Sequence, residues 1–256
     1  MAEEGAPLGI IAAMPEEIRY LGDALVVDDK VMRGGFPFRL GRLDGVPVVL
    51  VEAGIGKVNT AVVATLLLDH FGCRAVLLTG AAGGLDPALG IGDVVIADRL
   101  IQHDYGALID GRLKPFRPGE PPLGEPRDKL SFDLDADVRR ALQRRLSGFR
   151  LPELPAAATG GKPREPTIRF GTVLSGDQFI NCEATRKRLF ESFAAQAVEM
   201  EGAAVAQVAE RFGAPCIVVR SVSDLAGAES HVDFRAFLDS AAEAAAQVLR
   251  RIVPAL

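Results

Sequence analysis

Short apolar runs bounded by Gly and Pro alternate along this chain with longer segments of helical periodicity. Such alternation is typical of α/β folds, in which helices cover a central sheet. Several of the runs have the length and composition of buried strands. They are Leu8–Ala13, Ala75–Leu78, Val94–Gln102, Arg169–Leu174 and Cys216–Val222. The sequence therefore predicts an α/β sandwich.

The segments between these runs have helical patterns with recognisable ends. Pro15 stands where the first turn of a helix begins, and Gly72 follows another helix as a C-terminal cap. Residues 29–53 differ, because Gly34-Gly35 and Asp44-Gly45 are turn signals that predict a meander of short strands. Helices are expected over residues 15–21, 57–71, 136–146, 183–193, 201–212 and 234–252.

Two stretches rich in Pro and Gly interrupt this alternation, near residues 105–131 and 152–166. We predict that both are irregular excursions over the surface. No repeat and no linker divides the chain, and 256 residues suit one large α/β domain. The expected organisation is a single domain over residues 1–256.

The composition argues against several functional classes. A net charge of −5 disfavours general binding to nucleic acid or to an anionic membrane. No apolar run approaches 18 residues, and Met1–Pro7 lacks the basic segment that opens a signal peptide. Cys73, Cys182 and Cys216 form neither a zinc-binding spacing nor a closed disulfide set. We expect a soluble cytoplasmic protein without a bound metal.

Two glutamates one residue apart, Glu199 and Glu201, flank Met200 between an apolar stretch and a helix. In an extended segment, side chains two positions apart point to the same side. Carboxylates accept hydrogen bonds from hydroxyl groups, and a thioether packs on the carbon face of a sugar. The three residues suit a polyhydroxylated ligand such as a ribose. The alternative is a strand end whose charges lie in solvent.

Polar or glycine-rich segments follow the ends of several expected strands. They are Glu17, Gly80–Gly84, Ser175–Asp177, Glu201 and Asp224. Open α/β sheets bind ligands in the crevice at the carboxyl ends of their strands, so these segments are candidates for one site. Each also has a structural alternative: Asp224 as a turn cap, Glu17 as a favourable charge in a first helical turn, and the glycines as tight turns.

Familiar cofactor motifs are not met. Gly54–Val58 lacks the upstream glycine and the Ser/Thr of a P-loop, and Gly80–Gly84 does not have the dinucleotide-binding spacing. His70 and His103 are expected at the ends of a helix and a strand. His231 precedes the last helix and is a candidate pocket residue.

In combination, these segments resemble the 5′-methylthioadenosine/S-adenosylhomocysteine nucleosidases of the nucleoside phosphorylase superfamily. The matching blocks, in the family's order, are Gly9–Glu17, Gly54–Val58, Thr79–Gly84, Ser175–Asn181, Val198–Glu201 and Val219–Asp224. The resemblance implies a three-layer α/β/α sandwich with a central mixed twisted sheet, and no cofactor or metal. It also implies hydrolysis of the N-glycosidic bond of methylthioadenosine and S-adenosylhomocysteine, which gives adenine and a 5-substituted ribose.

Carried over residue by residue, the resemblance implies three catalytic carboxylates. Asp224 would be the general acid that protonates purine N7, with Ser223 orienting it. Glu17 would hold and deprotonate the attacking water, and Glu201 would bind the ribose hydroxyls with Met200 against the sugar. Carboxylates near the sugar stabilise the positive charge that builds as the bond breaks. The acid needs a raised pKa, while the water-activating carboxylate stays ionised.

The resemblance also implies residues that hold the substrate. Phe179 would stack on adenine, and the backbone of Ile180 would read the edge of the base. Glu199 and Arg220 would form a paired layer behind the ribose. The remaining substrate-binding positions are Ala81, Gly83 and Phe234. The family often has a serine at the place of Ala81, so one hydroxyl contact is missing here.

Three other functions remain open on this fold. A nucleoside phosphorylase needs cations to hold phosphate, but Leu78 stands where hexameric phosphorylases carry an arginine, and Glu16 and Glu17 would repel phosphate. A hydrolase of another 5′-modified nucleoside, such as futalosine, is compatible with the same blocks. A non-catalytic nucleoside-binding protein would have no need of a water-activating acid.

The partners implied by the resemblance are a small-molecule nucleoside, water and a second copy of the chain. In the family, the region that corresponds to residues 105–126 shapes the pocket for the 5′ substituent, often across a dimer interface. The apolar face of Val58–Leu68 would serve a homodimer, or it is a stripe that faces the core. Nucleic acid and membrane are not expected as partners.

Overall fold

A mixed sheet forms the centre of the computed structural model, which describes residues 5–125, 129–159, 162–227 and 230–256. Its strands are β1 (Leu8–Ala12), β2 (Leu25–Arg33), β3 (Phe36–Leu43), β4 (Val46–Glu52), β5 (Ala75–Gly84), β6 (Val94–Gln102), β9 (Phe132–Asp133), β10 (Ile168–Ser175), β11 (Ala197–Glu199) and β12 (Cys216–Asp224). They lie in the order β11-β10-β6-β12-β5-β1-β4-β3-β2, with β9 beside β6.

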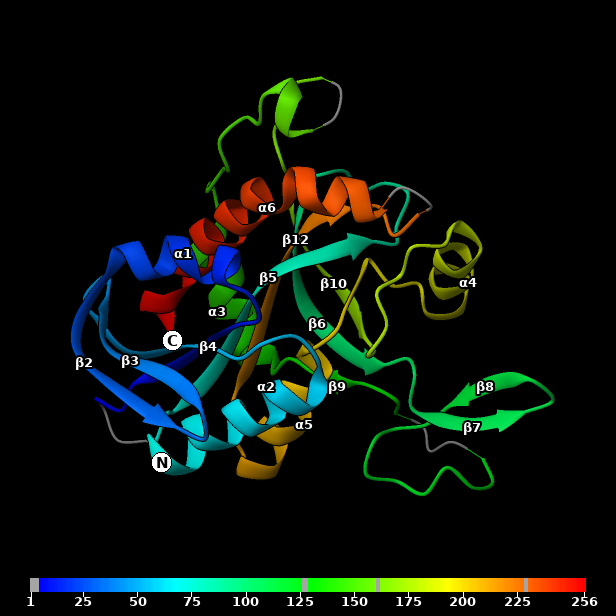
Figure 1. Cartoon of the computed structure of the whole chain (residues 1–256), viewed down its shortest axis with the longest axis horizontal. Coiled ribbons are helices and arrows are strands. Elements are labelled where there is room, and N and C mark those ends of the chain that lie inside the picture. The colour runs from blue at the N-terminus through cyan, green and yellow to red at the C-terminus, as the bar shows by residue number, and fades with distance from the viewer. Residues whose placement is uncertain (1–4, 126–128, 160–161, 228–229) are drawn as a thin grey trace.

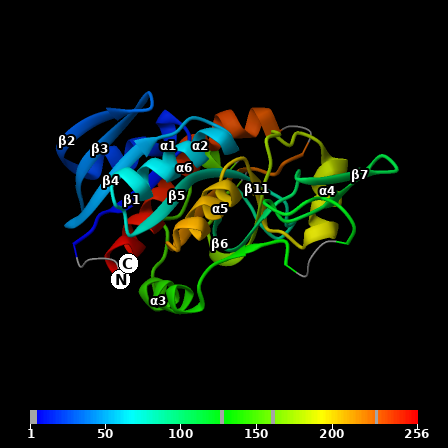
Figure 2. The same ribbon diagram turned by 90° about the horizontal axis from the view of Figure 1, so that it is seen from below.

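Helices cover both faces of this sheet (Figure 1). On one face lie α1 (Pro15–Ala24), α3 (Ala136–Leu146) and α6 (Ser230–Ile252). On the other face α2 (Lys57–Thr65) and α5 (Gly202–Phe212) lie side by side, as Figure 2 shows, and α4 (Glu183–Phe193) stands near the end of β10. The predicted three-layer α/β/α sandwich with a mixed sheet is confirmed.

The strand period explains why the sheet takes helices on both sides. Successive side chains of a strand point to opposite faces, and both Ile10 and Ile11 of β1 are fully buried. Ile10 packs with the core under α1, α3 and α6, whereas Ile11 packs with the core under α2 and α5. In β5, Leu77 packs with the core under α1, α3 and α6, and Leu78 packs with the core under α2 and α5. Continuous apolar runs in the sequence therefore reflect burial on both faces.

Several expected boundaries shift. The first helix extends to Ala24, and the last begins at Ser230 rather than at residue 234. The helix expected over residues 57–71 ends at Thr65 and continues as a π-helical turn, Leu66–His70. Short 3₁₀ turns occur at Ala156–Ala158 and Val253–Ala255. Among the described residues, no helix is long and apolar enough to span a bilayer.

The three residues of β11 close part of the sheet into a ring. They pair in parallel with β10 and antiparallel with the end of β5, where Ala197 opposes Gly84 and Val198 opposes Gly83. Where β6 pairs with β12 it runs antiparallel, and β10 is parallel to β6. The expected place of the site was the crevice at the carboxyl ends of the strands. At that edge β11 joins the ends of β10 and β5, so this part of the sheet is closed rather than open.

The two Pro- and Gly-rich stretches contain more order than expected. Residues 105–131 contain a hairpin of β7 (Gly106–Ile109) and β8 (Arg112–Pro115), which stands away from the sheet in Figure 1. Its turn is formed by Asp110 and Gly111, both with positive φ. Residues 152–166 are held by Arg164, whose guanidinium forms two hydrogen bonds, of 2.9 and 3.0 Å, to the buried carboxylate of Asp93.

Candidate active site

A cavity of about 300 Å³ lies where β5, β11 and β12 meet the start of α1. Its lining residues are Ala13, Met14, Glu17, Ile55, Ala81, Ala82, Gly83, Phe179, Val198, Glu199, Met200, Glu201, Ser223, Asp224 and Phe234. All the site residues predicted from the sequence are among them except Ile180 and Arg220. Three acidic side chains from distant parts of the chain, Glu17, Glu201 and Asp224, therefore share one cavity.

Glu17 is the third residue of α1 and is buried. Its Oε2 accepts the backbone N–H groups of Ala13 (2.8 Å) and Met14 (3.0 Å), so it caps its own helix. Its Oε1 accepts the N–H of Ala81 (2.8 Å) from β5. A Cβ atom at Gly80 would lie 2.2 Å from this Oε1, so only glycine lets Glu17 approach β5 so closely. The structural role and the predicted chemical role of Glu17 coexist.

Glu199 is fixed by the start of α5. It accepts the backbone N–H groups of Glu201 (3.0 Å) and Gly202 (2.8 Å to Oε2), and the hydroxyl of Ser175 donates to its Oε1. That hydroxyl oxygen in turn accepts the N–H of Ala203 at 2.7 Å. A carboxylate at a helix N-terminus is stabilised by the free N–H groups and by the helix dipole. Glu199 therefore supports the site from behind.

Arg220 joins the glutamates beneath the cavity. It is fully buried, and its Nη2 bonds to Glu199 Oε2 and, at 2.8 Å, to Glu201 Oε2, while its Nη1 lies 3.8 Å from Glu17 Oε1. Glu199 and Glu201 thus point to the same side, as their spacing predicts. The other Glu201 oxygen, Oε1, accepts the N–H of Gly56 at 2.8 Å.

The charges of this cluster do not cancel, since one guanidinium faces three carboxylates. Burial and, to a smaller extent, the neighbouring Glu199 raise the pKa of Glu201 to about 7, although Arg220 lowers it. Burial also raises the pKa of Glu17, although Arg220 and three backbone N–H groups oppose the shift. A raised pKa was expected from the sequence at the general acid, with the water-activating Glu17 ionised, whereas the structure raises the pKa of Glu17. A raised pKa makes a carboxylate a stronger base.

Asp224 ends β12, lines the same cavity and is also buried. Its Oδ1 accepts the N–H of Ala226 at 2.9 Å, and its Oδ2 lies 3.0 Å from Ser223 Oγ. The same hydroxyl oxygen is 3.5 Å from the carbonyl oxygen of Ala82. Ser223 can therefore donate to Asp224 when the carboxylate is ionised and accept from it, while donating to Ala82, when it is protonated. This arrangement suits a group that gives up a proton.

An aromatic pair forms the open side of the cavity. The rings of Phe179 and Phe234 meet edge to face, with centroids 5.7 Å apart, and Phe179 is 49% exposed. Such a pair offers a flat apolar surface to a planar ligand. Ile180 is buried and lines a small adjoining pocket rather than the main cavity.

Among the lining residues that the structure describes there is no Lys or Arg. No group of three or more His, Cys, Asp and Glu residues within the described parts of the chain is arranged to hold a metal ion. His103 lies at a strand end, as expected, and burial lowers its pKa. The side chain of His231 lies outside the described residues.

Gly56 and Ile55 were not assigned to the site from the sequence. Gly56 acts through its backbone N–H, and Ile55 lines the cavity. Ser175, which belongs to a segment predicted for the site, holds Glu199 through its hydroxyl. Gly56 has a φ of +103°, which glycine adopts readily, and it directly precedes a helix. That combination is a readable signal for a backbone donor at a helix N-terminus.

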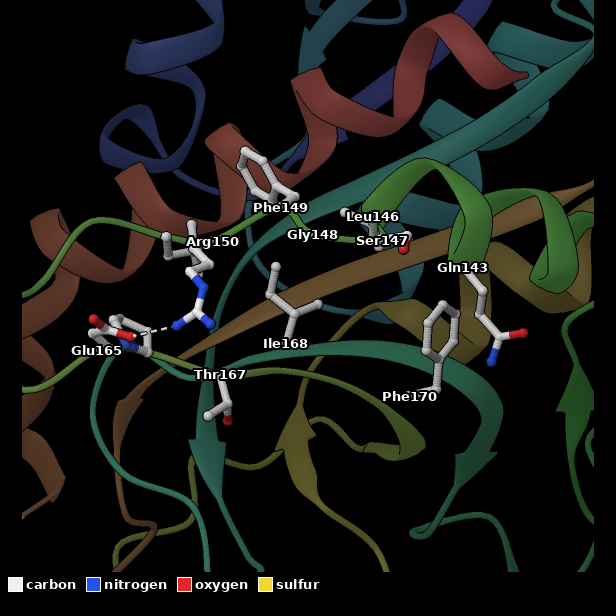
Figure 3. Close-up of a pocket in the computed structure, with 12 residues that line it drawn as sticks. Gln143, Leu146, Ser147, Gly148, Phe149, Arg150, Glu165, Thr167, Ile168 and Phe170 are labelled. Atoms are coloured by element: carbon white, nitrogen blue, oxygen red, sulfur yellow. Dashed lines mark hydrogen bonds and ion pairs between the residues drawn. The ribbon is translucent and has the colours of Figure 1, made fainter.

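A second cavity, of about 570 Å³, lies at the start of β10 beside the end of α3 (Figure 3). Its walls include Leu146, Phe149, Ile168 and Phe170. The ion pair drawn in Figure 3, between Arg150 Nη1 and Glu165 Oε2, is 3.2 Å long and exposed. Glu165 is the one carboxylate among its described lining residues, and it is exposed.

Comparisons with known proteins agree with this geometry. The profile of the phosphorylase superfamily matches residues 7–254. A 5′-methylthioadenosine/S-adenosylhomocysteine nucleosidase of Mycobacterium bovis is 49% identical over 97% of both chains. The nucleosidase of Neisseria meningitidis, solved with methylthio-immucillin-A, is 30% identical with a TM-score of 0.81, covering 98% of this chain and 100% of its own. The futalosine hydrolase of Helicobacter pylori is equally similar (30%, TM-score 0.81), covering 98% and 99%.

Proposed function

This chain belongs to the phosphorylase superfamily and, within it, to the 5′-methylthioadenosine/S-adenosylhomocysteine nucleosidases, and we propose that it hydrolyses the N-glycosidic bond of 5′-substituted adenosines. The products are adenine and a 5-substituted ribose. The observation that carries the proposal is the meeting of Glu17, Glu201 and Asp224 around one cavity, among whose described lining residues there is no Lys or Arg. Such a cavity suits a neutral nucleoside that becomes positively charged at the sugar as it reacts.

In the proposed reaction, Asp224 acts as the general acid. Its proton passes to N7 of the purine, so that the bond between C1′ and N9 breaks and adenine leaves as a neutral base. The hydrogen bond between Asp224 and Ser223 supports this role, because Ser223 serves both protonation states. Phe179 and Phe234 supply an apolar surface for the departing base.

Glu17 acts as the base toward water. The water oxygen bonds to C1′, and its proton passes to Glu17, whose raised pKa favours the transfer. Glu201 accepts hydrogen bonds from the ribose hydroxyls, and Met200 packs on the sugar. Arg220 and Glu199 keep Glu201 in place from below. Overall one water is added across the broken bond.

Phosphorolysis is the rival reaction, and the charge of the cavity disfavours it. Phosphate would have to bind among buried carboxylates, while Arg220 is already engaged by Glu199 and Glu201. The deciding experiment follows adenine release from methylthioadenosine in phosphate-free buffer and again with phosphate. We expect release at the same rate in both. Release only with phosphate would indicate a phosphorylase, and binding without release a nucleoside-binding protein.

A second candidate substrate class is futalosine, because the Helicobacter pylori futalosine hydrolase matches this chain over nearly its whole length. The same three carboxylates would serve it, since the two reactions differ at the base and the 5′ substituent. A phosphate-free panel of methylthioadenosine, S-adenosylhomocysteine, adenosine and futalosine distinguishes them. We expect the highest kcat/KM with methylthioadenosine or S-adenosylhomocysteine.

We propose that the enzyme works as a homodimer in the cytoplasm. Ile55, Val58 and Val62 are exposed by 51%, 75% and 43% beside the cavity, which supports a partner surface at the start of α2. Sedimentation velocity should show a dimer that Val58→Glu dissociates. The free thiols of Cys73, Cys182 and Cys216 are typical of a reducing compartment, and cell fractionation tests the location.

A further inference from the structure

Helix α2 begins in a way that its own sequence does not stabilise. Its N-cap residue, Gly56, has no side chain to accept free N–H groups, and its first turn has no acidic residue. Its first residue is Lys57, a cation at the end of the helix where the dipole disfavours one. The missing cap comes from outside the helix, since Asp177 Oδ1 accepts the backbone N–H of Lys57 at 3.0 Å.

The side chains of Lys57, Asp104 and Asp177 form a cluster around this point, which we call the Lys57 cluster. Lys57 Nζ lies 2.7 Å from Asp104 Oδ1 and 3.7 Å from Asp177 Oδ2. The backbone N–H of Asp177 donates to Asp104 Oδ2 at 2.9 Å. The Lys57 and Asp104 side chains are each only 17% exposed. The cluster thereby joins the segments that follow β4, β6 and β10.

The surroundings of Asp104 within the cluster favour its ionised form. Burial alone would raise the pKa of Asp104, but the hydrogen bonds from Lys57 and from the Asp177 backbone hold it below its ordinary value. The lysine offsets the repulsion between the two aspartates. Its removal leaves two adjacent carboxylates without a cation.

Each segment tied by the cluster carries or adjoins a residue of the proposed site, although no cluster member lines the cavity. Gly56, next to Lys57, donates its N–H to Glu201 Oε1 at 2.8 Å. Ile55 lines the cavity, and so does Phe179, two residues after Asp177. A shift of the cluster would therefore move the donor on Glu201 and the ring of Phe179 together.

We propose that Lys57, Asp104 and Asp177 are positioning residues, which hold the Gly56 N–H against Glu201 and the Phe179 segment beside it. This inference rests on the proposed function of Glu201 and Phe179. The Gly56 N–H donates to Glu201 Oε1 and Arg220 Nη2 donates to Oε2, so the carboxylate is held in one orientation. Its remaining lone pairs are then free to accept hydrogen bonds from the sugar hydroxyls. Loss of the cluster frees the carboxylate to turn.

The test is Lys57→Met, assayed for adenine release from methylthioadenosine across pH. We expect kcat/KM to fall by roughly 10- to 100-fold, as for the loss of one hydrogen bond to a buried charge. The acidic limb of the kcat/KM profile should also move to higher pH, because the Gly56 N–H lowers the pKa of Glu201. The other charged groups that face Glu201 are Arg220 of β12, Glu199 of β11 and Glu17 of α1, and the variant keeps them.

Two further variants give the controls. Lys57→Arg keeps the cation and should retain activity within about fivefold, as Arg and Lys share the charge but not the geometry. Lys187→Met removes an exposed lysine that lies 3.8 Å from Glu191 on α4, and it should leave both kcat/KM and the pH profile unchanged.

The outcomes separate this inference from the proposed function. A wild-type enzyme that releases no adenine without phosphate overturns the proposed function. A folded Lys57→Met protein with wild-type kcat/KM overturns the positioning role, and so does a loss of activity without movement of the acidic limb. Should Lys57→Met fail to fold, kcat/KM and the position of the acidic limb are measured for Asp104→Asn instead. This variant keeps the shape of the side chain and removes its charge, and the same outcomes decide.

Discussion

The two cavities at the two ends of β10 differ in how their charged groups are held. The cavity at the start of the strand is larger, about 570 Å³, but its Arg150 and Glu165 side chains are 81% and 62% exposed and pair with each other. The cavity beyond its end is about 300 Å³ and is lined by carboxylates that are almost fully buried. Burying charge is costly, so a protein that does so without full compensation has a use for it. The burial of charge, more than the volume of a cavity, indicates the active site.

The substitution Asp224→Asn is expected to have the largest effect and is the strongest test of whether the cavity with buried carboxylates is the active site. The amide keeps the size of the side chain, but its N–H protons are too weakly acidic to be transferred to the purine. We expect kcat for methylthioadenosine to fall about 10³-fold, within the range of general acid catalysis, with little change in KM. Steady-state adenine release measures both. Glu165→Gln at the second cavity is the matched control, and an Asp224→Asn enzyme as active as this control would remove Asp224 from the acid role.

A second test compares two arginines. Arg220→Met leaves Glu17, Glu199 and Glu201 buried without their cation, so we expect the free energy of unfolding to fall by about 3–5 kcal/mol. Arg150→Met, at the second cavity, removes an exposed partner of Glu165 and should change it little. Urea denaturation of both variants gives the comparison. Equal losses of unfolding free energy in the two variants would mean that the buried cluster depends on its arginine no more than the exposed ion pair does.

The pH dependence of stability sharpens the comparison further. The pKa of Glu201 is about 7 in the folded protein and 4.5 for an ordinary exposed glutamate, so the folded state binds the proton more tightly. The contribution of Glu201 to the free energy of unfolding is therefore greatest below pH 4.5 and falls as pH rises to about 7, by on the order of 1–3 kcal/mol. Glu17, whose pKa is also raised, acts in the same direction.

Denaturation of the ligand-free protein between pH 5 and pH 7, beside Glu201→Gln, measures this contribution. The lowered pKa of His103 has the opposite effect on stability, but both proteins share it and it cancels in the difference. We expect the difference in unfolding free energy between wild type and variant to become smaller as pH falls. A difference independent of pH would show that Glu201 titrates normally.

The smallest effects are expected at the second cavity. Glu165→Gln breaks one exposed ion pair, which contributes little in water. The thermal midpoint should move by less than about 2 °C, and kcat for methylthioadenosine should stay within twofold. Differential scanning calorimetry and the adenine assay check this. A large loss of activity would give the second cavity a role in the reaction.

The α/β architecture was predictable because burial on both faces leaves continuous apolar runs such as Leu8–Ala12. The closure of the sheet was not, because β11 has only three residues and its pairing with β5 is a long-range contact. The β7–β8 hairpin had a readable signal in Asp110-Gly111, a pair typical of tight hairpin turns. That signal was lost among the glycines and prolines around it.

The site was predictable where it depends on side chains with unusual charge. Glu17, Glu201 and Asp224 follow strand ends in the sequence, and the structure brings them to one cavity. The donor on Glu201 was missed because Gly56 contributes only a backbone N–H. The role of Asp177 as a cap for α2 depends on a partner 120 residues away, which local patterns do not reveal.

The brevity of β11 has a consequence for how this enzyme can vary. Side chains alternate across a strand, so one added or deleted residue in Ala197–Glu199 would turn the inward glutamate outward and displace the next one. The strand could not shift its register to compensate, since both of its edges are paired, with β10 and with β5. Insertions and deletions should therefore be tolerated in residues 152–166. They should not be tolerated in β11, because its three residues determine the direction in which the glutamates of the acidic cluster point.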